Sequence, residues 1–265
     1  MSLQTSGQRA EAVLTAKAEG DHVGLSAAFP GAAVARFGSV VATRLPALGD
    51  HAPYNKARHV SLSEAHLLAD IVAFYDEVGV RPSLEVLELD ATDELGEWLG
   101  DAGFSPIADG TTLHATPSGV APVEVSGVDI REVGGVDGDR YLEVLLDAYE
   151  LPAGASALRQ MFAHEHASPG LRRYLALIGG TPTAAAALYT CEGTGLFVGA
   201  ATLPAFRRHG CQAALIARRL ADAAADSDLV VATAAAGSTS HENLARHGFE
   251  TTHRRTLWRR DDKTP

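Results

Sequence analysis

The predicted secondary structure of this chain is repeated. Between residues 67 and 114, a helix with an apolar stripe is followed by a strand, a short helix, Gly103-Phe104 and a last strand. The same order recurs between residues 215 and 258, with Gly248-Phe249 in the equivalent place. Helices that alternate with apolar strands are typical of α/β folds. We interpret the repeat as a duplicated α/β unit. Its period of more than about a hundred residues is too long for a solenoid. Chance similarity of two α/β halves is the alternative.

The length and composition of the chain suit two globular domains. It has 265 residues, of which 46% are hydrophobic and 21% are charged. These values are typical of folded domains of ordinary size. The segment 117–122, Pro-Ser-Gly-Val-Ala-Pro, has the composition of a linker. We therefore predict one domain over residues 1–118 and a second over residues 119–265.

The spacing of apolar residues, with Gly, Pro and Ser as boundary signals, gives a prediction for each element. Helices are expected over residues 1–20, 61–79, 93–100, 139–149, 156–166, 211–225 and 240–247. Strands are expected within residues 21–50 and over residues 84–89, 111–114, 128–133, 173–178, 184–191, 195–201, 228–233 and 251–258.

Charge and hydropathy exclude several classes of function. The net charge is −11, and residues 1–118 hold 16 acidic side chains against 7 basic ones. Nucleic-acid binding is not expected, because a phosphate backbone requires a sustained basic face. No apolar run approaches the ~18–20 residues of a membrane span, and no secretory signal is visible. The 2 cysteines form no disulfide framework or metal cluster. We expect a cytoplasmic protein with reduced thiols, no metal and no membrane partner.

One stretch, residues 202–215, has the features of an anion-binding loop. An apolar strand precedes it, and an amphipathic helix follows it. Between Glu192 and Asp222 there is no acidic residue, but there are four arginines. A loop of this kind directs backbone N–H groups and the positive end of a helix toward one point, which suits a phosphate.

Two motifs in the second half resemble those of the GNAT superfamily of N-acetyltransferases. Leu203-Pro204-x-Phe206-Arg207-Arg208-x-Gly210-Cys211-Gln212-x-Ala214-Leu215 is similar to the family's acyl-CoA pyrophosphate loop. Ser240-x-x-Asn243-x-x-Arg246-x-Gly248-Phe249 is similar to its second motif. The first half resembles the same fold but has no such loop at residues 54–59. The resemblance implies an α/β (α+β) chain of two GNAT-like units, each a mixed, mostly antiparallel sheet flanked by helices, with a degenerate first unit.

The resemblance also implies a reaction. The family transfers an acetyl group from acetyl-CoA directly to a primary amine, with both substrates held in a ternary complex. The alternative is an acyl-CoA-binding sensor without catalysis. A backbone N–H at Ala201 or Thr202 is expected to polarise the thioester carbonyl. The other cofactor-binding residues that the resemblance implies are Arg207, Arg208, His209, Gly210, Cys211, Gln212, Ala213, Ser240 and Asn243, although Ser240 is alternatively only a helix N-cap.

The groups that move protons are not defined by the motifs. Gln212 stands where relatives have Gly or Ala, and Leu244 stands where many relatives have the tyrosine that protonates the leaving thiolate. Glu192, near the start of the cofactor strand, and Glu150, near the helix break at Pro152, are the candidate bases. Glu192 is alternatively a turn carboxylate. A further candidate base is the run His164-Glu165-His166, alternatively a solvated helix end. The strand tyrosines Tyr174 and Tyr189 are candidate substitute acids, alternatively core or edge packing.

The acceptor is predicted only by class. The excess of acidic residues in the first half favours a cationic amine, such as a polyamine, an aminoglycoside or a protein amine, through electrostatic steering. The chain is expected to be a monomer or a homodimer.

Overall fold

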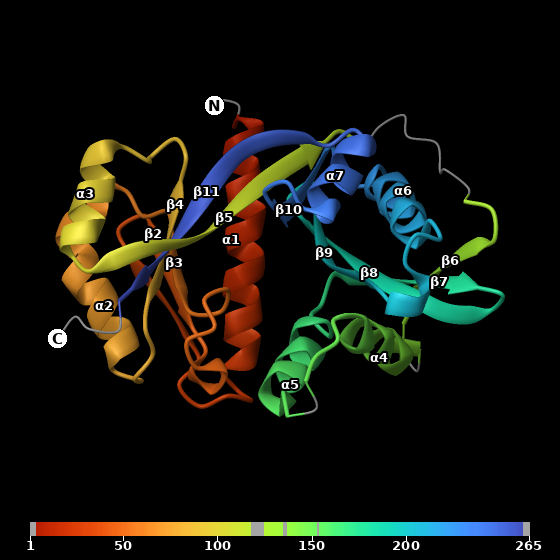
Figure 1. The fold of residues 1–265 in the computed structure, drawn as a ribbon, viewed down its shortest axis with the longest axis horizontal. Helices are drawn as coiled ribbons and strands as arrows, with labels where there is room; N and C mark the ends of the chain where they lie inside the picture. The colour runs from red at the N-terminus through yellow and green to blue at the C-terminus, as the bar shows by residue number, and fades with distance from the viewer. Residues whose placement is uncertain (1–3, 118–124, 135–136, 153, 262–265) are drawn as a thin grey trace. The chain divides into compact units, whose positions relative to one another are not determined.

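The computed structural model describes residues 4–117, 125–134, 137–152 and 154–261, and divides the chain into two compact units (Figure 1). The C-terminal unit comprises Met1–Leu14 and Leu113–Thr252, and the N-terminal unit comprises Thr15–Thr112 and His253–Pro265. The predicted boundary at residues 118/119 and most of the predicted linker lie outside the described residues. Three elements contribute residues to both units. They are α1 (Ser6–Leu25), β5 (Phe104–Ala115) and β11 (Glu250–Arg260).

The C-terminal unit is built on a mixed, mostly antiparallel sheet. Its strands occur in the spatial order β10-β9-β8-β7-β6, and only β9 and β10 are parallel to each other. The strands are β6 (Val128–Val133), β7 (Leu171–Ile178), β8 (Thr181–Cys191), β9 (Thr194–Thr202) and β10 (Leu229–Ala235). The helices are α4 (Asp137–Ala148), α5 (Ser156–Glu165), α6 (Cys211–Ala223) and α7 (Thr239–Arg246), and a 3-10 turn covers Pro204–Phe206.

Helices cover both faces of this sheet, with α6 and α7 on one face and α4 and α5 on the other (Figure 1). Strand β8 shows why, because its alanines alternate between two hydrophobic clusters. Ala184 and Ala186 pack in a cluster with Leu215 of α6, whereas Ala185 and Ala187 pack in a cluster with α4. The small side chains allow both helices to approach the strand closely.

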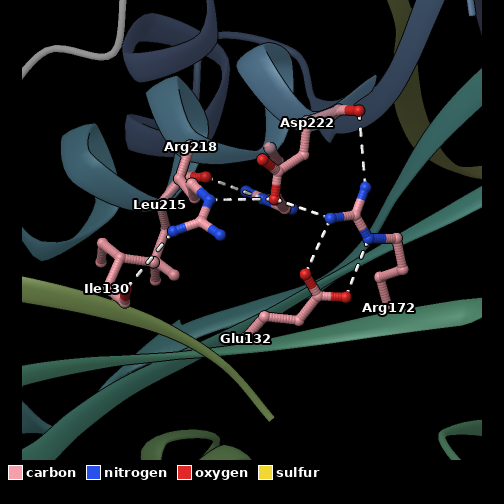
Figure 2. Close-up of polar contacts among 7 residues, drawn as sticks. Ile130, Glu132, Arg172, Leu215, Arg218 and Asp222 are labelled. Carbon is pink, nitrogen blue, oxygen red and sulfur yellow. Dashed lines mark hydrogen bonds and ion pairs between the residues drawn. The ribbon is translucent and has the colours of Figure 1, made fainter. Parts of the chain in front are cut away.

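Polar contacts fix α6 to the strands at the edge of the sheet (Figure 2). Arg172 of β7 binds the Glu132 carboxylate of β6 through two N–H groups, at 2.9 and 2.7 Å. The same guanidinium donates to Asp222 Oδ2 of α6 at 3.0 Å, and Arg218 Nε donates to that oxygen at 2.9 Å. Arg218 Nη1 also donates to the Ile130 carbonyl at 3.5 Å. These bonds hold the helix that follows the predicted phosphate loop in a fixed position.

The N-terminal unit has a sheet of the same kind, in the order β1-β2-β3-β4-β11, in which only β3 and β4 are parallel. The strands are β1 (Ala33–Phe37), β2 (Val40–Arg44), β3 (Lys56–Arg58) and β4 (Ser83–Leu87). The helices are α2 (Leu68–Asp76) and α3 (Asp93–Asp101), with 3-10 turns at Pro46–Leu48 and Leu62–Leu67. Apolar strand residues such as Leu84 and Val86 pack against Ile71 of α2 and Leu99 of α3.

The predicted fold class is confirmed, because each unit has a mixed, mostly antiparallel sheet flanked by helices. The predicted repeat is also present. The order α2-β4-α3-β5 in the first half recurs as α6-β10-α7-β11 in the second. Residues 59–67 separate β3 from α2 and residues 203–210 separate β9 from α6, and a 3-10 helix lies within each of these connections. The lack of a phosphate loop in the first half therefore remains a prediction from its sequence.

Two predicted helices differ from the structure. The helix predicted from residue 61 begins as a 3-10 helix at Leu62, and no side chain caps it. The hydroxyls of Ser61 and Ser63 instead donate to the Glu64 carboxylate, both at 2.6 Å. The first helix passes Gly20 and ends at Leu25, where strands were predicted. Contacts across Gly20 support this extension, because His22 Nδ1 lies 2.9 Å from the Ala18 carbonyl oxygen.

Strand β3 was not predicted from the sequence, because two of its three residues are charged, although Arg58 is buried and Lys56 is partly buried. Glu85 of β4 is 3% exposed and lies 2.7 Å from Lys56 Nζ, 3.1 Å from Arg58 Nη2 and 3.7 Å from Arg255 Nε. Desolvation raises the pKa of the Glu85 carboxyl, but the three cations outweigh it and hold the pKa well below its usual range. Desolvation also lowers the pKa of Lys56 to about 8, despite the attraction of Glu85.

This buried ion cluster gives a stability prediction. We expect Glu85→Gln to destabilise the protein by about 3–5 kcal/mol at neutral pH, because buried cations lose their counter-charge. The folded-state pKa of Glu85 is depressed, so its contribution is present above the unfolded pKa of ~4.3 and is lost as the pH falls. Denaturant unfolding of wild type and variant from neutral to acid pH measures both effects. Glu97→Gln, on the exposed face of α3, is the control. A Glu85→Gln variant as stable as the control contradicts the assignment.

Candidate functional site

A bulge interrupts strand β9 close to the predicted phosphate loop. Val198 pairs with Ala187 of β8, but Ala200 pairs with Ala186, so Gly199 is an extra residue. Gly199 has a φ of +43°, and a Cβ there would lie 2.6 Å from His166 Cε1. His166, at the end of α5, is itself held by Tyr141 of α4, with 2.8 Å between the Tyr141 hydroxyl and Nδ1. The bulge is therefore packed tightly and accepts only glycine.

The bulge determines the direction of the backbone N–H groups that follow it. The Leu203 N–H donates to the Thr183 carbonyl of β8 at 2.9 Å. Because N–H groups of an antiparallel strand alternate between its two edges, Ala201 also faces β8, whereas Ala200 and Thr202 face the opposite edge. Thr202, one of the two predicted carbonyl-binding residues, therefore has its N–H on the edge of β9 that faces away from β8, and so does Ala200, which was not predicted. The N–H of Ala201, the other predicted residue, points at β8 instead.

Strand β10 occupies that opposite edge only in part. The register of β10 with β9 covers Leu229–Val231 against Thr194–Leu196, and within the described residues it extends no further. The two parallel strands part beyond Leu196, so the edge of β9 that carries the Ala200 and Thr202 N–H groups is not taken up by β10. Strand N–H groups that are not paired with a neighbouring strand are suited to bind the oxygen of a polarised carbonyl.

The loop from Leu203 to Gly210 leads into the N-terminus of α6. A 3-10 turn over Pro204–Phe206 begins the loop, and Arg208 has a left-handed φ of +67°. Gly210 is the N-cap of α6, with a φ of +82°, and no side chain caps the helix. The N–H groups of residues 211–213 therefore have no acceptor within the helix. This arrangement is typical of an anion site at the positive end of a helix dipole.

The two adjacent arginines of the loop differ in their contacts. Arg207 Nη2 donates to the Glu150 carboxylate at 2.6 Å, and both side chains are more than half exposed. Glu150, a predicted base, thus lies at the loop and is paired with a predicted phosphate ligand. Arg208 makes no polar contact within the part of the chain that the structure describes. Arg208 is the guanidinium of this loop that remains available to an anion.

The other loop residues present their backbone and not their side chains. Gln212 turns its side chain toward β9, where Nε2 donates to the Thr202 hydroxyl at 3.0 Å. Its size therefore does not obstruct the loop. His209 Nδ1 lies 3.0 Å from the Arg207 carbonyl. Cys211 is buried in the core, with Sγ 3.5 Å from the Thr183 hydroxyl. Ala213 continues the first turn of α6.

The second motif lies on α7. Ser238 caps this helix by accepting a hydrogen bond from the His241 N–H at 3.2 Å, so the alternative interpretation of Ser240 as the N-cap is wrong. Asn243 Oδ1 accepts a hydrogen bond from Arg246 at 2.6 Å. Leu244 is 5% exposed and packs in the core with α6. The residue at the family's tyrosine position therefore has a structural role here.

Glu192 lies at the opposite end of β9 from the loop. It occupies the two-residue hairpin turn between β8 and β9, with a φ of +47°. The nine residues of β9 span roughly 26 Å at ~3.3 Å per residue. The structure therefore does not bring Glu192 to the loop, and its position agrees with the alternative of a turn carboxylate.

Sequence reasoning missed Tyr149, the residue that follows α4. Desolvation and then the charge of Glu165 raise the pKa of Tyr149 to about 12, against a smaller opposing effect of the Ala200 backbone. Its ring stacks on Phe162 of α5, with 5.4 Å between ring centroids. The one signal in the sequence was its position next to Glu150.

The described residues contain no group of three or more His, Cys, Asp or Glu side chains arranged to hold a metal ion. Among those same residues, no helix is both long enough and apolar enough to cross a membrane.

Comparisons with known proteins agree with this geometry. Residues 142–233 match the family model described as an acetyltransferase (GNAT) domain. This segment contains Tyr149, Glu150, the β9 bulge and the whole loop. No curated protein sequence matches the chain.

Solved structures of similar fold cover most of the chain. A GCN5-related N-acetyltransferase from Kribbella flavida superimposes with a TM-score of 0.67 at 19% identity, over 93% of this chain and 95% of its own. A tandem GNAT protein from the clavulanic acid biosynthesis pathway gives 0.61 at 19% identity, over 91% and 86%. A GCN5-related N-acetyltransferase from Sphaerobacter thermophilus gives 0.61 at 17% identity, over 83% and 79%. Residues 142–233 therefore match a GNAT acetyltransferase domain, and the chain shares its fold with these GNAT structures.

Proposed function

We propose that this chain transfers an acetyl group from acetyl-CoA to a primary amine, by direct transfer in a ternary complex. The observation that carries the proposal is the bulged strand β9 followed by the loop at Gly210 and the uncapped N-terminus of α6. This segment combines free-edge N–H groups for a carbonyl oxygen with an anion site for a pyrophosphate. A thioester linked to a pyrophosphate is the ligand that requires both.

The roles of the residues follow from their positions. The loop N–H groups of residues 208–213 and the Arg208 guanidinium bind the pyrophosphate of acetyl-CoA. The N–H groups of Ala200 and Thr202 bind the thioester oxygen, and preorganised donors of this kind contribute ~10²–10³ in rate. The amine nitrogen attacks the carbonyl carbon, the C–N bond forms, and the C–S bond breaks to release CoA. Ser240 and Asn243 of the second motif are proposed contacts of the CoA arm.

Glu150 is the predicted carboxylate that suits the acceptor side. It lies at the loop through its bond to Arg207, whereas Glu192 lies at the far end of β9. We propose that Arg207 orients Glu150, and that Glu150 accepts a proton from the incoming ammonium, directly or through water. A neutral amine is required, because a protonated nitrogen has no lone pair for attack.

The class of acceptor substrate, the cellular compartment and the assembly are proposed only in broad terms. The acidic balance of residues 1–118 favours a cationic acceptor such as a polyamine, an aminoglycoside or a protein amine. The free thiols of Cys191 and Cys211 agree with a reducing compartment, and we propose the cytoplasm. A monomer or a homodimer remains the proposed assembly.

A non-catalytic acyl-CoA sensor is the second candidate, because Leu244 is buried where a tyrosine acid is common and the sequence of the first half has no loop motif at residues 54–59. A panel of spermidine, kanamycin and a lysine-containing peptide, with detection of free thiol, distinguishes the two candidates. We expect thiol release above the rate of acetyl-CoA hydrolysis for at least one amine. Acetyl-CoA binding without such release would favour the sensor.

The first binding prediction concerns Arg208. Acetyl-CoA is expected to raise the melting temperature, since a ligand that binds the folded state stabilises it. Arg208→Ala should weaken acetyl-CoA binding roughly tenfold, because a charge-assisted hydrogen bond is lost. Thermal shift across an acetyl-CoA titration measures both effects. Arg131→Ala, an exposed arginine of β6 paired with Asp129, is the matched control. Equal affinities for the two variants contradict the phosphate role of Arg208.

The second binding prediction concerns Gly210, where a Cβ would lie 2.6 Å from Val125 Cγ1 at a φ of +82°. Gly210→Ala should displace the loop and remove most of the acetyl-CoA thermal shift. Gly170→Ala is the control, since Gly170 has a similar φ of +79° but open space around its Cβ position. Both variants incur the left-handed strain of about 1–2 kcal/mol. A Gly210→Ala variant that binds as well as the control would show that the loop does not hold the cofactor.

A further inference from the structure

We propose that Arg219 of α6 is a positioning residue for the acyl transfer: its buried guanidinium supports the β9 bulge and places a fixed positive charge close to the carbonyl site. The proposal rests on the proposed function and adds a residue that lies outside both sequence motifs. Arg219 is in the third turn of α6, beyond the loop that is proposed to bind the pyrophosphate.

The Arg219 guanidinium contacts both strands at the bulge. Nη1 donates to the Ala187 carbonyl of β8 at 3.1 Å. The guanidinium carbon lies 3.8 Å from the centroid of the Phe197 ring of β9, which is within the range of a cation–π contact. Ala187 is one of the two residues between which the register of β8 with β9 shifts. One side chain of α6 thus reaches the two strands at the point where their pairing is interrupted.

The Ala187 carbonyl that Arg219 binds faces β9. Cys191 and Thr194 flank the two-residue turn between β8 and β9, and residues in that position of a hairpin exchange hydrogen bonds. Every second residue back along β8 has the same orientation, so Ala187 also directs its carbonyl at β9. A bulge disrupts the ladder locally, and Arg219 supplies a donor there.

Arg219 is buried without a counter-charge. It is 2% exposed, and within the described parts of the chain it forms no ion pair. Its hydrogen bonds go to two backbone carbonyls, those of Ala187 and Leu215, both at 3.1 Å. Desolvation lowers the pKa of the guanidinium to about 10, so the group is still charged at neutral pH. A buried charge without a partner costs free energy, and such groups are found where a charge serves the reaction.

The neighbouring arginine of α6 has the more usual environment. Arg218 is partly exposed, and its Nε donates to the Asp222 carboxylate at 2.9 Å (Figure 2). Arg172 of β7 donates to the same carboxylate at 3.0 Å. Both of these guanidinium groups are therefore balanced by acids at the edge of the sheet. Arg219 carries the charge that is directed at the bulge.

This charge lies close to the two N–H groups assigned to the thioester oxygen. Ala187 pairs with Val198, and Ala200 follows Val198 by two residues along β9. At ~3.3 Å per residue, the guanidinium is roughly 7–10 Å from the carbonyl site. A unit charge acts appreciably over such a distance inside a protein, because the effective dielectric constant is far below that of water.

The transfer creates a negative charge for Arg219 to stabilise. As the neutral amine adds to the carbonyl carbon, the π electrons of the C=O bond move to oxygen. They return when the C–S bond breaks and CoA leaves as a thiolate, and the nitrogen releases one proton to water. Because the thioester of the bound substrate is neutral, a fixed positive charge favours the transition state over the bound state. Arg219 should therefore act on kcat more than on acetyl-CoA affinity.

The test removes the charge and keeps the volume of the side chain. Arg219→Met has a neutral side chain of similar length, Arg219→Lys keeps the charge, and Arg131→Met, at the exposed arginine of β6, is the control. We expect ligand-free Arg219→Met to melt at or above the wild-type temperature, because an apolar side chain often replaces a buried charge without loss of stability. Acetyl-CoA affinity, from thermal shift across a titration, should stay within about threefold of wild type.

Two further readouts follow the charge. With an amine from the panel, Arg219→Met should lower kcat roughly tenfold and leave KM for acetyl-CoA within about threefold, and Arg219→Lys should recover part of the loss. The infrared carbonyl stretch of bound acetyl-CoA, labelled with ¹³C at the thioester, needs no acceptor. It should lie at higher frequency in Arg219→Met than in wild type, because the carbonyl is less polarised. The control should match wild type in both readouts.

The outcomes separate this proposal from the proposed function. If wild type does not bind acetyl-CoA, the proposed function fails and the role of Arg219 fails with it. If wild type binds, a carbonyl frequency in Arg219→Met equal to that of wild type, or a kcat within about twofold of wild type, overturns only the role of Arg219. An Arg219→Met variant that does not fold, or that loses the acetyl-CoA thermal shift, would assign Arg219 to stability alone and would also overturn it.

Discussion

The bulge at Gly199 is the constraint on which the rest of the site depends. One extra residue in β9 reverses the alternation of its N–H groups, so that Ala200 and Thr202 face the edge that β10 leaves. An uninterrupted strand would direct these groups at β8. His166 packs against the bulge where a side chain would otherwise be, and therefore Gly199 tolerates no substitution at low cost.

The elements around the bulge fix two further groups relative to it. On one face of the sheet, α6 follows its N-cap Gly210 and is held to β7 by the hydrogen bond from Arg172 to Asp222. On the other face, Glu150 lies just after the end of α4 and contacts the loop through Arg207. The proposed anion site, the proposed carbonyl site and the proposed base Glu150 are thus positioned by one strand and two helix ends. Packing of β8 alanines against both helices maintains that spacing.

Much of the fold was predictable because it depends on local patterns. The apolar stripes of the helices and the Gly-Phe signals gave the repeated order of elements in both halves. The loop proposed to bind a phosphate could be recognised for the same reason, since its glycine, its arginines and the absence of acidic residues lie within one short stretch. The position of Leu244 in the core also follows the apolar pattern of α7.

The remaining features depend on contacts between distant residues. Strand β3 is short and charged, and it exists because Glu85 compensates its buried cations. The pairing of Glu150 with Arg207 joins residues 57 positions apart. Glu192 is close to the cofactor strand in sequence but lies at its far end in space.

The most direct test of the account is the infrared spectrum of acetyl-CoA labelled with ¹³C at the thioester carbonyl and bound to the protein. Because the N–H groups of Ala200 and Thr202 are assigned to the carbonyl oxygen, the account predicts a carbonyl stretch at lower frequency in the complex than in water. The same shift should be lost when the loop is displaced by Gly210→Ala. A bound thioester whose carbonyl frequency equals that of free acetyl-CoA in water would contradict the central claim.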